Sequence, residues 1–277
     1  MEMVKAKVIV FLLSLLPVIA SAQEYEWKSA VMDGSRTGCT AVTKENQKQA
    51  LGRLDNGNYI APNGSVHKSS SAAAKVASVV MAAQPRMARV KEVIAYSEAE
   101  MPTMKKECPL SNWFVKIIMD KVSALSGRSV DVGIGNFGGI RLGMPEGEVI
   151  LDDILSMFPF KNNVVYLELM GSDLRRIFEK MAATRFQAIG GVDILAENGR
   201  LVRANIGGQP IDDGKMYSVA TISFLLYGGD SLTLAENAEN MKIYDVAIVD
   251  VALEHLAHLS ARGEKITAPD VRYVTVK

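Results

Sequence analysis

Hydrophobic positions over most of the chain recur with helical and strand periods in alternation. Segment 72–96 carries alanine and other apolar residues at helical spacing, and Pro85 is expected to end or kink that helix. A second apolar stripe runs over 110–125, where Ser111 is expected to cap the helix and Gly127 to end it. The pattern therefore predicts a lead-in helix, a break and a second, longer helix.

Strand-like runs of apolar residues follow. Segments 129–134, 164–170 and 216–226 read as strands rich in β-branched and aromatic residues. Ser172 is expected to cap a helix directly after the second of them, and a last long helix is expected near 245–262. Helices that alternate with strands are typical of an α/β or α+β domain.

The chain changes character before residue 72. Residues 23–71 are polar and rich in glycine, asparagine, proline and serine, which predicts a loop-rich extension with little regular structure. The sequence shows no internal repeat and no low-complexity tract. We therefore expect one layered helix–sheet domain of the α/β (α+β) class over 72–277.

Residues 1–22 have the composition of an export signal. Lys5 and Lys7 precede an apolar run that Pro17 interrupts, and Ala20-Ser21-Ala22 has the small residues that signal peptidase requires. The run is too short to span a bilayer comfortably. We expect cleavage there, a periplasmic or extracellular protein, and no membrane attachment after cleavage.

Charge and cysteines narrow the classes of partner. The formal net charge is 0, so no broad basic field favours a nucleic-acid polymer or an anionic membrane. The cysteines are Cys39 and Cys108, whose separation is not a metal-ligand spacing. In an oxidising compartment a disulfide between them and two buried free thiols are both consistent with the sequence.

Residues 131–141, "DVGIGNFGGIR", contain the dinucleotide spacing G-x-G-x-x-G at Gly133, Gly135 and Gly138. That motif works only where the last glycine opens a helix whose N-terminus receives a pyrophosphate. Here the following residues, "GIRLGMPEGEV", hold too many glycines and prolines for a helix to begin. The helix that a dinucleotide-binding motif requires is therefore not expected here, and the glycines need another explanation.

Two explanations remain from the residues themselves. Gly138 and Gly139 could serve a tight turn that leaves Arg141 on the surface, or they could let the backbone approach a ligand beside Asn136 and Arg141. Two later turns, "FPFKNN" and "SFLLYGGDS", add aromatic rings, a second amide and a carboxylate. Together these side chains suit a nucleoside. The candidates named by the residues themselves are Asn136, Arg141, Phe224 and Asp230, with one ring and one amide from 158–163.

Four segments in one order carry a resemblance to a known family. They read "ECPLSNWFVKIIMD", "GNFGGIRLGMPEGEVILDDILSMFPFKNN", "LMGSDLRRIFE" and "PIDDGKMYSVATISFLLYGGD". This set resembles the C-terminal, substrate-binding domain of the 5′-nucleotidases, secreted or periplasmic enzymes that dephosphorylate nucleotides. The resemblance covers about residues 90–235, with the spacing preserved throughout.

The resemblance implies a role for each candidate residue. Phe160 and Phe224 would hold the base between their rings, and Asp230 would accept the ribose hydroxyls. Stacking on an aromatic ring tolerates any base, because every base has a π-face. Asn136 and Asn162 would address the base edge.

The resemblance also implies cations near the sugar and the phosphate. Arg141 would lie on the ribose or phosphate side. The family places basic residues just before the start of the helix at 110–125, where this chain has Lys105 and Lys106. Met104 stands where an arginine would be expected, so one cation contact is missing from the pattern.

Full 5′-nucleotidases carry their chemistry in a metallophosphatase domain, where histidines and carboxylates hold two metal ions. The histidines of this chain are His67, His255 and His258, and none has a recognisable ligand spacing. We therefore expect no catalytic residue and no metal or other cofactor in this chain, with divalent metals held by a separate metallophosphatase partner.

The sequence thus predicts the substrate-binding half of an exported 5′-nucleotidase that serves nucleotide catabolism and scavenging. A protein that binds nucleotides or nucleosides without hydrolysing them is the first alternative. A self-sufficient phosphatase with unrecognised chemistry is the second.

Overall fold

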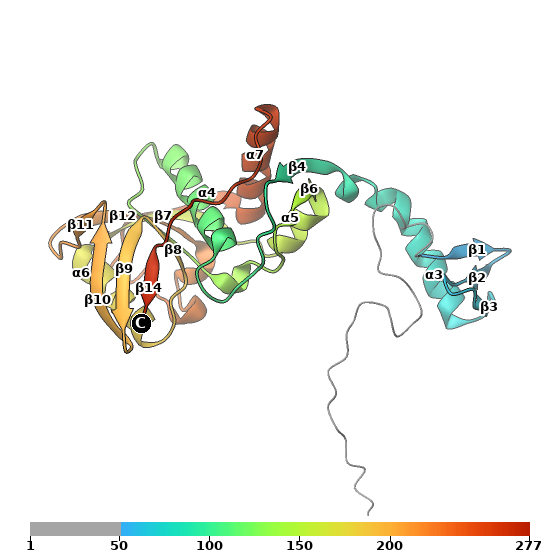
Figure 1. The fold of residues 1–277 in the computed structure, drawn as a ribbon, viewed down its shortest axis with the longest axis horizontal. Helices are drawn as coiled ribbons and strands as arrows, with labels where there is room; N and C mark the ends of the chain where they lie inside the picture. Colours follow the sequence, from blue (N-terminus) through green and yellow to red (C-terminus); the bar gives the residue numbers. More distant parts are fainter. Residues whose placement is uncertain (1–50) are drawn as a thin grey trace, which may run out of the picture. The chain divides into compact units, whose positions relative to one another are not determined.

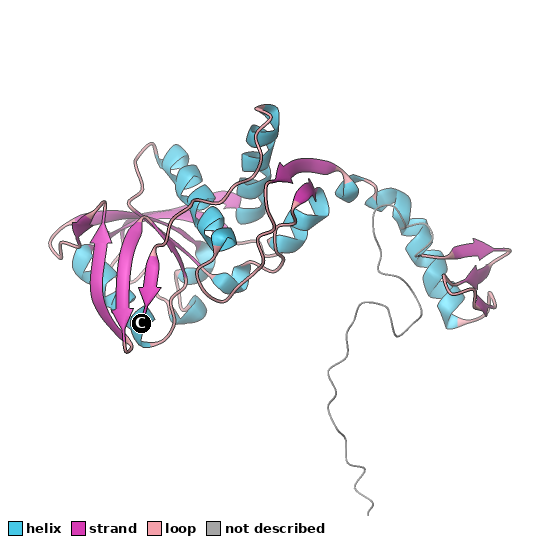
Figure 2. Ribbon diagram, viewed as in Figure 1, coloured by secondary structure: helices cyan, strands magenta, loops and turns pink. Residues whose placement is uncertain are grey.

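The computed structural model describes residues 51–277. They form two compact units, of which the first ends at Ala83 and the second begins at Gln84. The predicted export signal, the first part of the polar extension and Cys39 lie outside the described residues. Figures 1 and 2 show how helices and strands alternate along this part of the chain. Its α-helices are α3 (Ala72–Ala83), α4 (Pro109–Ser126), α5 (Leu151–Met157), α6 (Gly171–Ala183) and α7 (Ile248–Ala261).

The first unit contains a small antiparallel sheet followed by α3. Its strands are β1 (Arg53–Asp55), β2 (Asn58–Ile60) and β3 (Val66–His67). Asn56 and Gly57 both have positive φ and form the turn between β1 and β2. Asn-Gly is a strong hairpin signal, because both residues tolerate this backbone conformation. Within the described part of 23–71 the regular structure consists of these short strands, and the loop-rich extension over 23–71 stays a prediction.

Helix α3 ends before Pro85, as the sequence predicts. Ser71 caps it, since its Oγ accepts the N–H of Ala74 at 3.2 Å. The helical spacing over 72–96 is misleading beyond the proline, because two short 3₁₀ turns lead into strand β4 (Val93–Ser97). Proline removes the backbone donor that a continuing helix needs. The domain boundary expected at residue 72 stays a prediction.

The second unit is built on a five-stranded mixed sheet. In spatial order its strands are β13 (Glu239–Ala247), β7 (Asn163–Met170), β12 (Met216–Ile222), β5 (Val132–Gly135) and β8 (Ala188–Gly190). β12 is antiparallel to β7 and parallel to β5. The predicted strands therefore exist, although the run expected over 216–226 leaves the sheet after Ile222.

Helix α4 lies across β8, β5 and β12, and the glycines of "VGIG" explain how closely it packs. A Cβ on Gly133 would lie 2.5 Å from Cγ1 of Val115, and one on Gly135 would lie 2.4 Å from Cε1 of Phe114. Both distances are shorter than a van der Waals contact. These glycines thus serve helix–sheet packing, and only a 3₁₀ turn at Phe137–Gly139 follows them. The rejection of a dinucleotide motif is confirmed.

Two predicted helix caps are displaced by a few residues. Ser111 lies in the first turn of α4, where its Oγ accepts the N–H of Cys108 at 2.9 Å and donates to the carbonyl of Cys108 at 2.8 Å. Cys108 is the N-cap residue and is a buried free thiol. Ser172 lies inside α6, whose N-cap is Met170. Gly127 ends α4 with a φ of 68°, as predicted.

The remaining strands complete the layers. A four-stranded sheet consists, in spatial order, of β11 (Gln209–Pro210), β10 (Arg200–Ile206), β9 (Val192–Glu197) and β14 (Val274–Val276), and β4 pairs with β6 (Gly147–Ile150). Helix α6 packs against β10 and β7, and α7 against α4, β4 and β13. This layered arrangement of helices and sheets confirms the predicted α/β class. In the described part of the chain, no helix has the length and apolarity needed to cross a bilayer.

One carboxylate on the five-stranded sheet gives its stability a pH dependence. Glu168 of β7 accepts hydrogen bonds from the hydroxyl of Tyr166 at 2.5 Å, from Nδ2 of Asn240 at 2.5 Å and from the guanidinium of Arg128 at 2.7 Å. These bonds, that of Tyr166 foremost, lower the pKa of Glu168. The stabilisation is complete above the unfolded pKa of about 4.3 and is lost as the pH falls through the folded pKa.

We expect Glu168→Gln to reduce the free energy of unfolding by about 1 kcal/mol at pH 7, because it removes charge-assisted hydrogen bonds. The variant should lose less further stability than the parent between pH 5 and about pH 3. Urea denaturation followed by circular dichroism measures both. The matched control is Glu239→Gln, which changes an exposed glutamate on the neighbouring strand. If the free energies of unfolding of the parent and of Glu168→Gln change in parallel with pH, the hydrogen bonds of Glu168 contribute nothing to the pH dependence.

Candidate functional site

Three loops meet at one end of the five-stranded sheet. β12 and β7 are antiparallel with Ile222 opposite Val164, so the end of β12 lies beside the start of β7. β5 runs parallel to β12 with Gly133 opposite Ala220, so both strands end at this same edge. The turns that precede β7 and follow β12 and β5 carry all six predicted binding residues. Strand pairing therefore gathers residues that are far apart in the sequence.

The two phenylalanine rings lie on neighbouring turns and are only half covered. Phe160 is 48 % exposed and Phe224 is 45 % exposed. The backbone N–H of Asn163 donates to Oγ of Ser223 at 3.1 Å, which ties the two turns together. Neither ring stacks on another aromatic side chain among residues 51–277. Two half-exposed rings therefore lie on turns that are joined by a hydrogen bond.

The turn after Phe224 depends on its glycines. Gly228 has a φ of 111°, and a Cβ on Gly229 would lie 2.1 Å from the carbonyl oxygen of Phe224 and 2.8 Å from its ring. Asp230 follows with a φ of 46°, which is uncommon for a residue with a side chain. Strained backbone of this kind persists where the surroundings hold it, often at ligand sites. The turn places Gly229 against the Phe224 ring and Asp230 directly after it.

Asn136 joins this turn to the loop after β5. Its Nδ2 donates to Oδ2 of Asp230 at 2.8 Å, and the residue is buried, with an exposure of 4 %. Its Oδ1 is buried and has no hydrogen-bond partner in the described structure. A buried unpaired carbonyl oxygen is costly, so a donor from a ligand would relieve it. Asn136 is thus placed to orient Asp230 and to offer one free acceptor.

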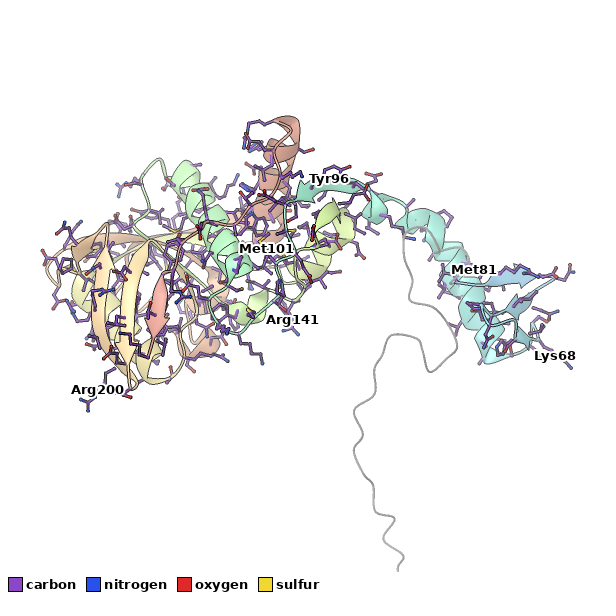
Figure 3. All side chains as sticks on the ribbon, in the orientation of Figure 1. Lys68, Met81, Tyr96, Met101, Arg141 and Arg200 are labelled. Atoms are coloured by element: carbon purple, nitrogen blue, oxygen red, sulfur yellow. The ribbon has the colours of Figure 1, made fainter. Side chains whose placement is uncertain are left out.

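Arg141 and Asn162 are the remaining two candidate residues at this edge of the sheet. The guanidinium carbon of Arg141 lies 5.8 Å from the centre of the Phe160 ring, within cation–π range, and Figure 3 labels this exposed arginine. Asn162 and Phe160 line a hollow with Asn136 and Gly139. Its volume of about 10 Å³ is no larger than one water molecule, so a base would lie over the hollow and not within it.

The structure therefore brings all six predicted residues to one edge of the sheet, although their binding roles stay predictions. The amide of Asn136 is engaged with Asp230, which leaves only its oxygen for the predicted contact with a base edge. Sequence reasoning missed the role of Ser223 and identified Gly229 only as a turn residue. The hydroxyl of Ser223 bonds across two strands, and no local pattern signals such a bond. Gly229 stands in the quoted "YGGD", but its contact with the Phe224 ring is visible only in three dimensions.

The histidines take no part in this site. His67 stacks on Tyr59, with ring centres 5.8 Å apart. His255 meets the ring of Trp113 at 6.1 Å, and its burial lowers its pKa. Within residues 51–277, no cluster of three or more histidine, cysteine or acidic side chains could hold a metal ion.

Comparison with known proteins assigns the second unit to a described family. The sequence model of the family "5′-nucleotidase, C-terminal domain" matches residues 86–237, which is more than half of the chain. The match contains α4, the five-stranded sheet except β13, and all six candidate residues.

The chain is also similar to individual proteins of known name. The chain is 29 % identical over 132 residues to Protein UshA of Salmonella pullorum, a match that covers 45 % of this chain and 24 % of the relative. It is 29 % identical over 173 residues to an apyrase of Tabanus yao, covering 51 % of this chain and 31 % of that protein. The fold is similar to that of a 5′-nucleotidase precursor from Thermus thermophilus, with a TM-score of 0.64 at 22 % identity over 73 % of this chain and 43 % of the other. The matched part thus spans about a quarter to a third of these curated relatives.

Proposed function

This chain belongs to the family of 5′-nucleotidase C-terminal domains, and from this membership we propose that it binds the nucleoside of a nucleotide between Phe160 and Phe224. The observation that carries the proposal is the pair of half-exposed rings on turns tied together by the Asn163–Ser223 hydrogen bond. Base stacking on an aromatic ring contributes about 1 to 3 kcal/mol and depends little on the base. The rings supply affinity, and the polar groups around them supply orientation.

Asp230 is proposed to accept the two ribose hydroxyls. Its Oδ2 already accepts the amide of Asn136, which fixes the plane of the carboxylate, while Oδ1 has no hydrogen-bond partner in residues 51–277. Charge-assisted hydrogen bonds are about twice as strong as neutral ones, and a carboxylate can accept from both hydroxyls of a vicinal diol. Discrimination for ribose follows from this one residue.

Arg141 and Asn162 are proposed to orient the rest of the nucleotide. Arg141 is exposed beside Phe160, so a base stacked on that ring would bring its sugar or phosphate oxygens within reach of a forked guanidinium donor. Asn162 offers both a donor and an acceptor to the base edge. The phosphate would face outward from the sheet edge.

The proposed hydrolysis takes place at a metallophosphatase site on a separate chain that docks against this one and holds the divalent metals. Support comes from the matched family, which is a C-terminal domain, and from relatives of which this chain covers only a minor part. We further propose that the protein is exported and serves nucleotide scavenging, on the strength of the signal-like residues 1–22.

The ribose contact has a direct test. Asp230→Asn is expected to reduce the preference for a ribonucleoside monophosphate over its 2′,3′-dideoxy analogue by about tenfold, because a neutral amide accepts more weakly than a carboxylate. Isothermal titration calorimetry with both ligands measures that preference. Asp55→Asn, which changes an exposed aspartate in the first unit, is the matched control. An unchanged preference in Asp230→Asn would remove Asp230 from the site.

A further inference from the structure

A cavity of about 680 Å³ lies in the second unit, and none of the six candidate nucleoside-binding residues lines it. Three segments form its walls: the approach to α4, with Lys105–Pro109; the end of α6 and the link to β8, with Met181–Gln187; and the C-terminal segment Pro269–Val276. Its volume falls within the range of small-molecule sites. The proposed nucleoside site leaves this cavity unexplained.

Hydrogen bonds hold the C-terminal wall in place. The carboxylate of Glu107 accepts the N–H groups of Tyr273 at 2.6 Å and Val274 at 2.9 Å. Nδ2 of Asn112 donates to the carbonyl of Val271 at 2.9 Å. The negative charge of Glu107 is therefore committed to backbone donors, and the wall is anchored by Glu107 before α4 and by Asn112 within it.

The cavity has an excess of cations. Lys105, Lys106, Arg185 and Arg272 line it, against the carboxylates of Glu107 and Asp270. None of the four cations forms a salt bridge or side-chain hydrogen bond within residues 51–277. Unpaired cations around a recess raise the local concentration of anions. Arginine in particular favours forked contacts with phosphate-like groups.

The inner surface adds one polar group to an apolar lining. Gln187 is only 5 % exposed and lines the cavity. Its Oε1 accepts the backbone N–H of Phe137 at 3.3 Å, whereas its amide nitrogen has no acceptor in the described structure. Phe137, Phe186 and Val274 supply apolar surface around it. The amide nitrogen of Gln187 is not among the buried side-chain atoms that lack a partner, so it reaches the surface of the cavity and is available to a ligand or to water.

We propose that this cavity binds a small organic anion, with an apolar body against Phe137 and Phe186 and a phosphate-like group held by Arg185 and Arg272. Gln187 donates its free N–H to the ligand. The combination of apolar lining, a few convergent polar groups and a cationic rim is typical of such sites. None of the six candidate nucleoside-binding residues lines this cavity, and the proposal rests on Arg185, Arg272 and Gln187, to which the family resemblance gives no role in nucleotide binding.

Titration calorimetry with phenyl phosphate, inorganic phosphate and benzyl alcohol separates the contribution of the anionic group to binding from that of the apolar ring. We expect saturable binding of phenyl phosphate with a dissociation constant below about 1 mM, and at least about tenfold weaker binding of the other two. Arg185→Gln with Arg272→Gln should weaken phenyl phosphate binding by about 10- to 100-fold, the usual cost of lost charge-assisted bonds. Lys75→Gln with Arg200→Gln, two exposed cations outside the cavity, should leave it unchanged.

Gln187→Glu is the sharpest single change. It keeps an oxygen to accept the N–H of Phe137, removes the free donor and adds a charge that repels an anion, so binding should again fall by about tenfold or more. Phe160→Ala should leave phenyl phosphate binding intact. The proposal is overturned if phenyl phosphate does not bind, if inorganic phosphate binds equally well, or if Phe160→Ala abolishes binding that the cavity variants retain. Circular dichroism of each variant confirms that the fold is kept.

Discussion

Replacing Phe160 or Phe224 with alanine is expected to weaken the binding of adenosine 5′-monophosphate by roughly 5- to 150-fold. Each substitution removes one stacking face, and a base–ring contact contributes about 1 to 3 kcal/mol. Both rings are about half exposed, so their truncation should cost little folding stability. Isothermal titration calorimetry gives the dissociation constants of the parent and the two variants.

Two further variants make that result specific. Tyr96→Ala removes an aromatic ring that is 50 % exposed on β4 and should leave binding unchanged. Phe160→Trp keeps a stacking face and should restore affinity. If both alanine variants bind within a few tenths of a kcal/mol of the parent, the rings do not hold the base.

Phosphate release is expected to require a second chain. Uncatalysed phosphomonoester hydrolysis is among the slowest reactions known, and stacking of a base does not stabilise the charge that develops at phosphorus. With Mn²⁺, Zn²⁺ or Mg²⁺ and adenosine 5′-monophosphate, this chain alone should release phosphate no faster than buffer. Adding a metallophosphatase chain exported by the same organism should raise the rate by orders of magnitude above that of either chain alone.

The phosphate assay has a clear contrary outcome. Metal-dependent turnover by the chain alone that survives repurification and is abolished by His255→Ala or His258→Ala would establish a self-sufficient phosphatase. If the mixture releases phosphate no faster than the metallophosphatase chain alone, this chain is a nucleotide-binding protein without a role in hydrolysis. Phe160→Ala should lower the rate of the two-chain mixture if the rings position the substrate.

The sequence predicted those helices and helix ends that depend on contacts between residues close together in the chain. The apolar stripe of α4 and the left-handed Gly127 after it involve neighbours three or four residues apart, so the helix and its end could be predicted. The cap at Ser111 was displaced because the preceding cysteine and proline define the start of the helix. The Asn56-Gly57 hairpin was missed because its strands are only three residues long.

Contacts across the sheet could not be predicted in this way. Asn136 and Asp230 lie 94 positions apart in the sequence, and only the pairing of β5 with β12 brings them together. The reason for Gly133 and Gly135 is likewise non-local, since it depends on side chains of α4. The resemblance to a family selected Phe160 and Asn162 and gave each binding residue its expected role, whereas the geometry that connects these residues came from the structure.

A crystal structure of this chain with adenosine 5′-monophosphate tests the central claim most directly. We predict the adenine between the rings of Phe160 and Phe224, both ribose hydroxyls within hydrogen-bond distance of Asp230, and the phosphate outside the sheet edge. An adenine bound elsewhere on the protein, or rings that remain uncovered at saturating nucleotide, would contradict the proposed site.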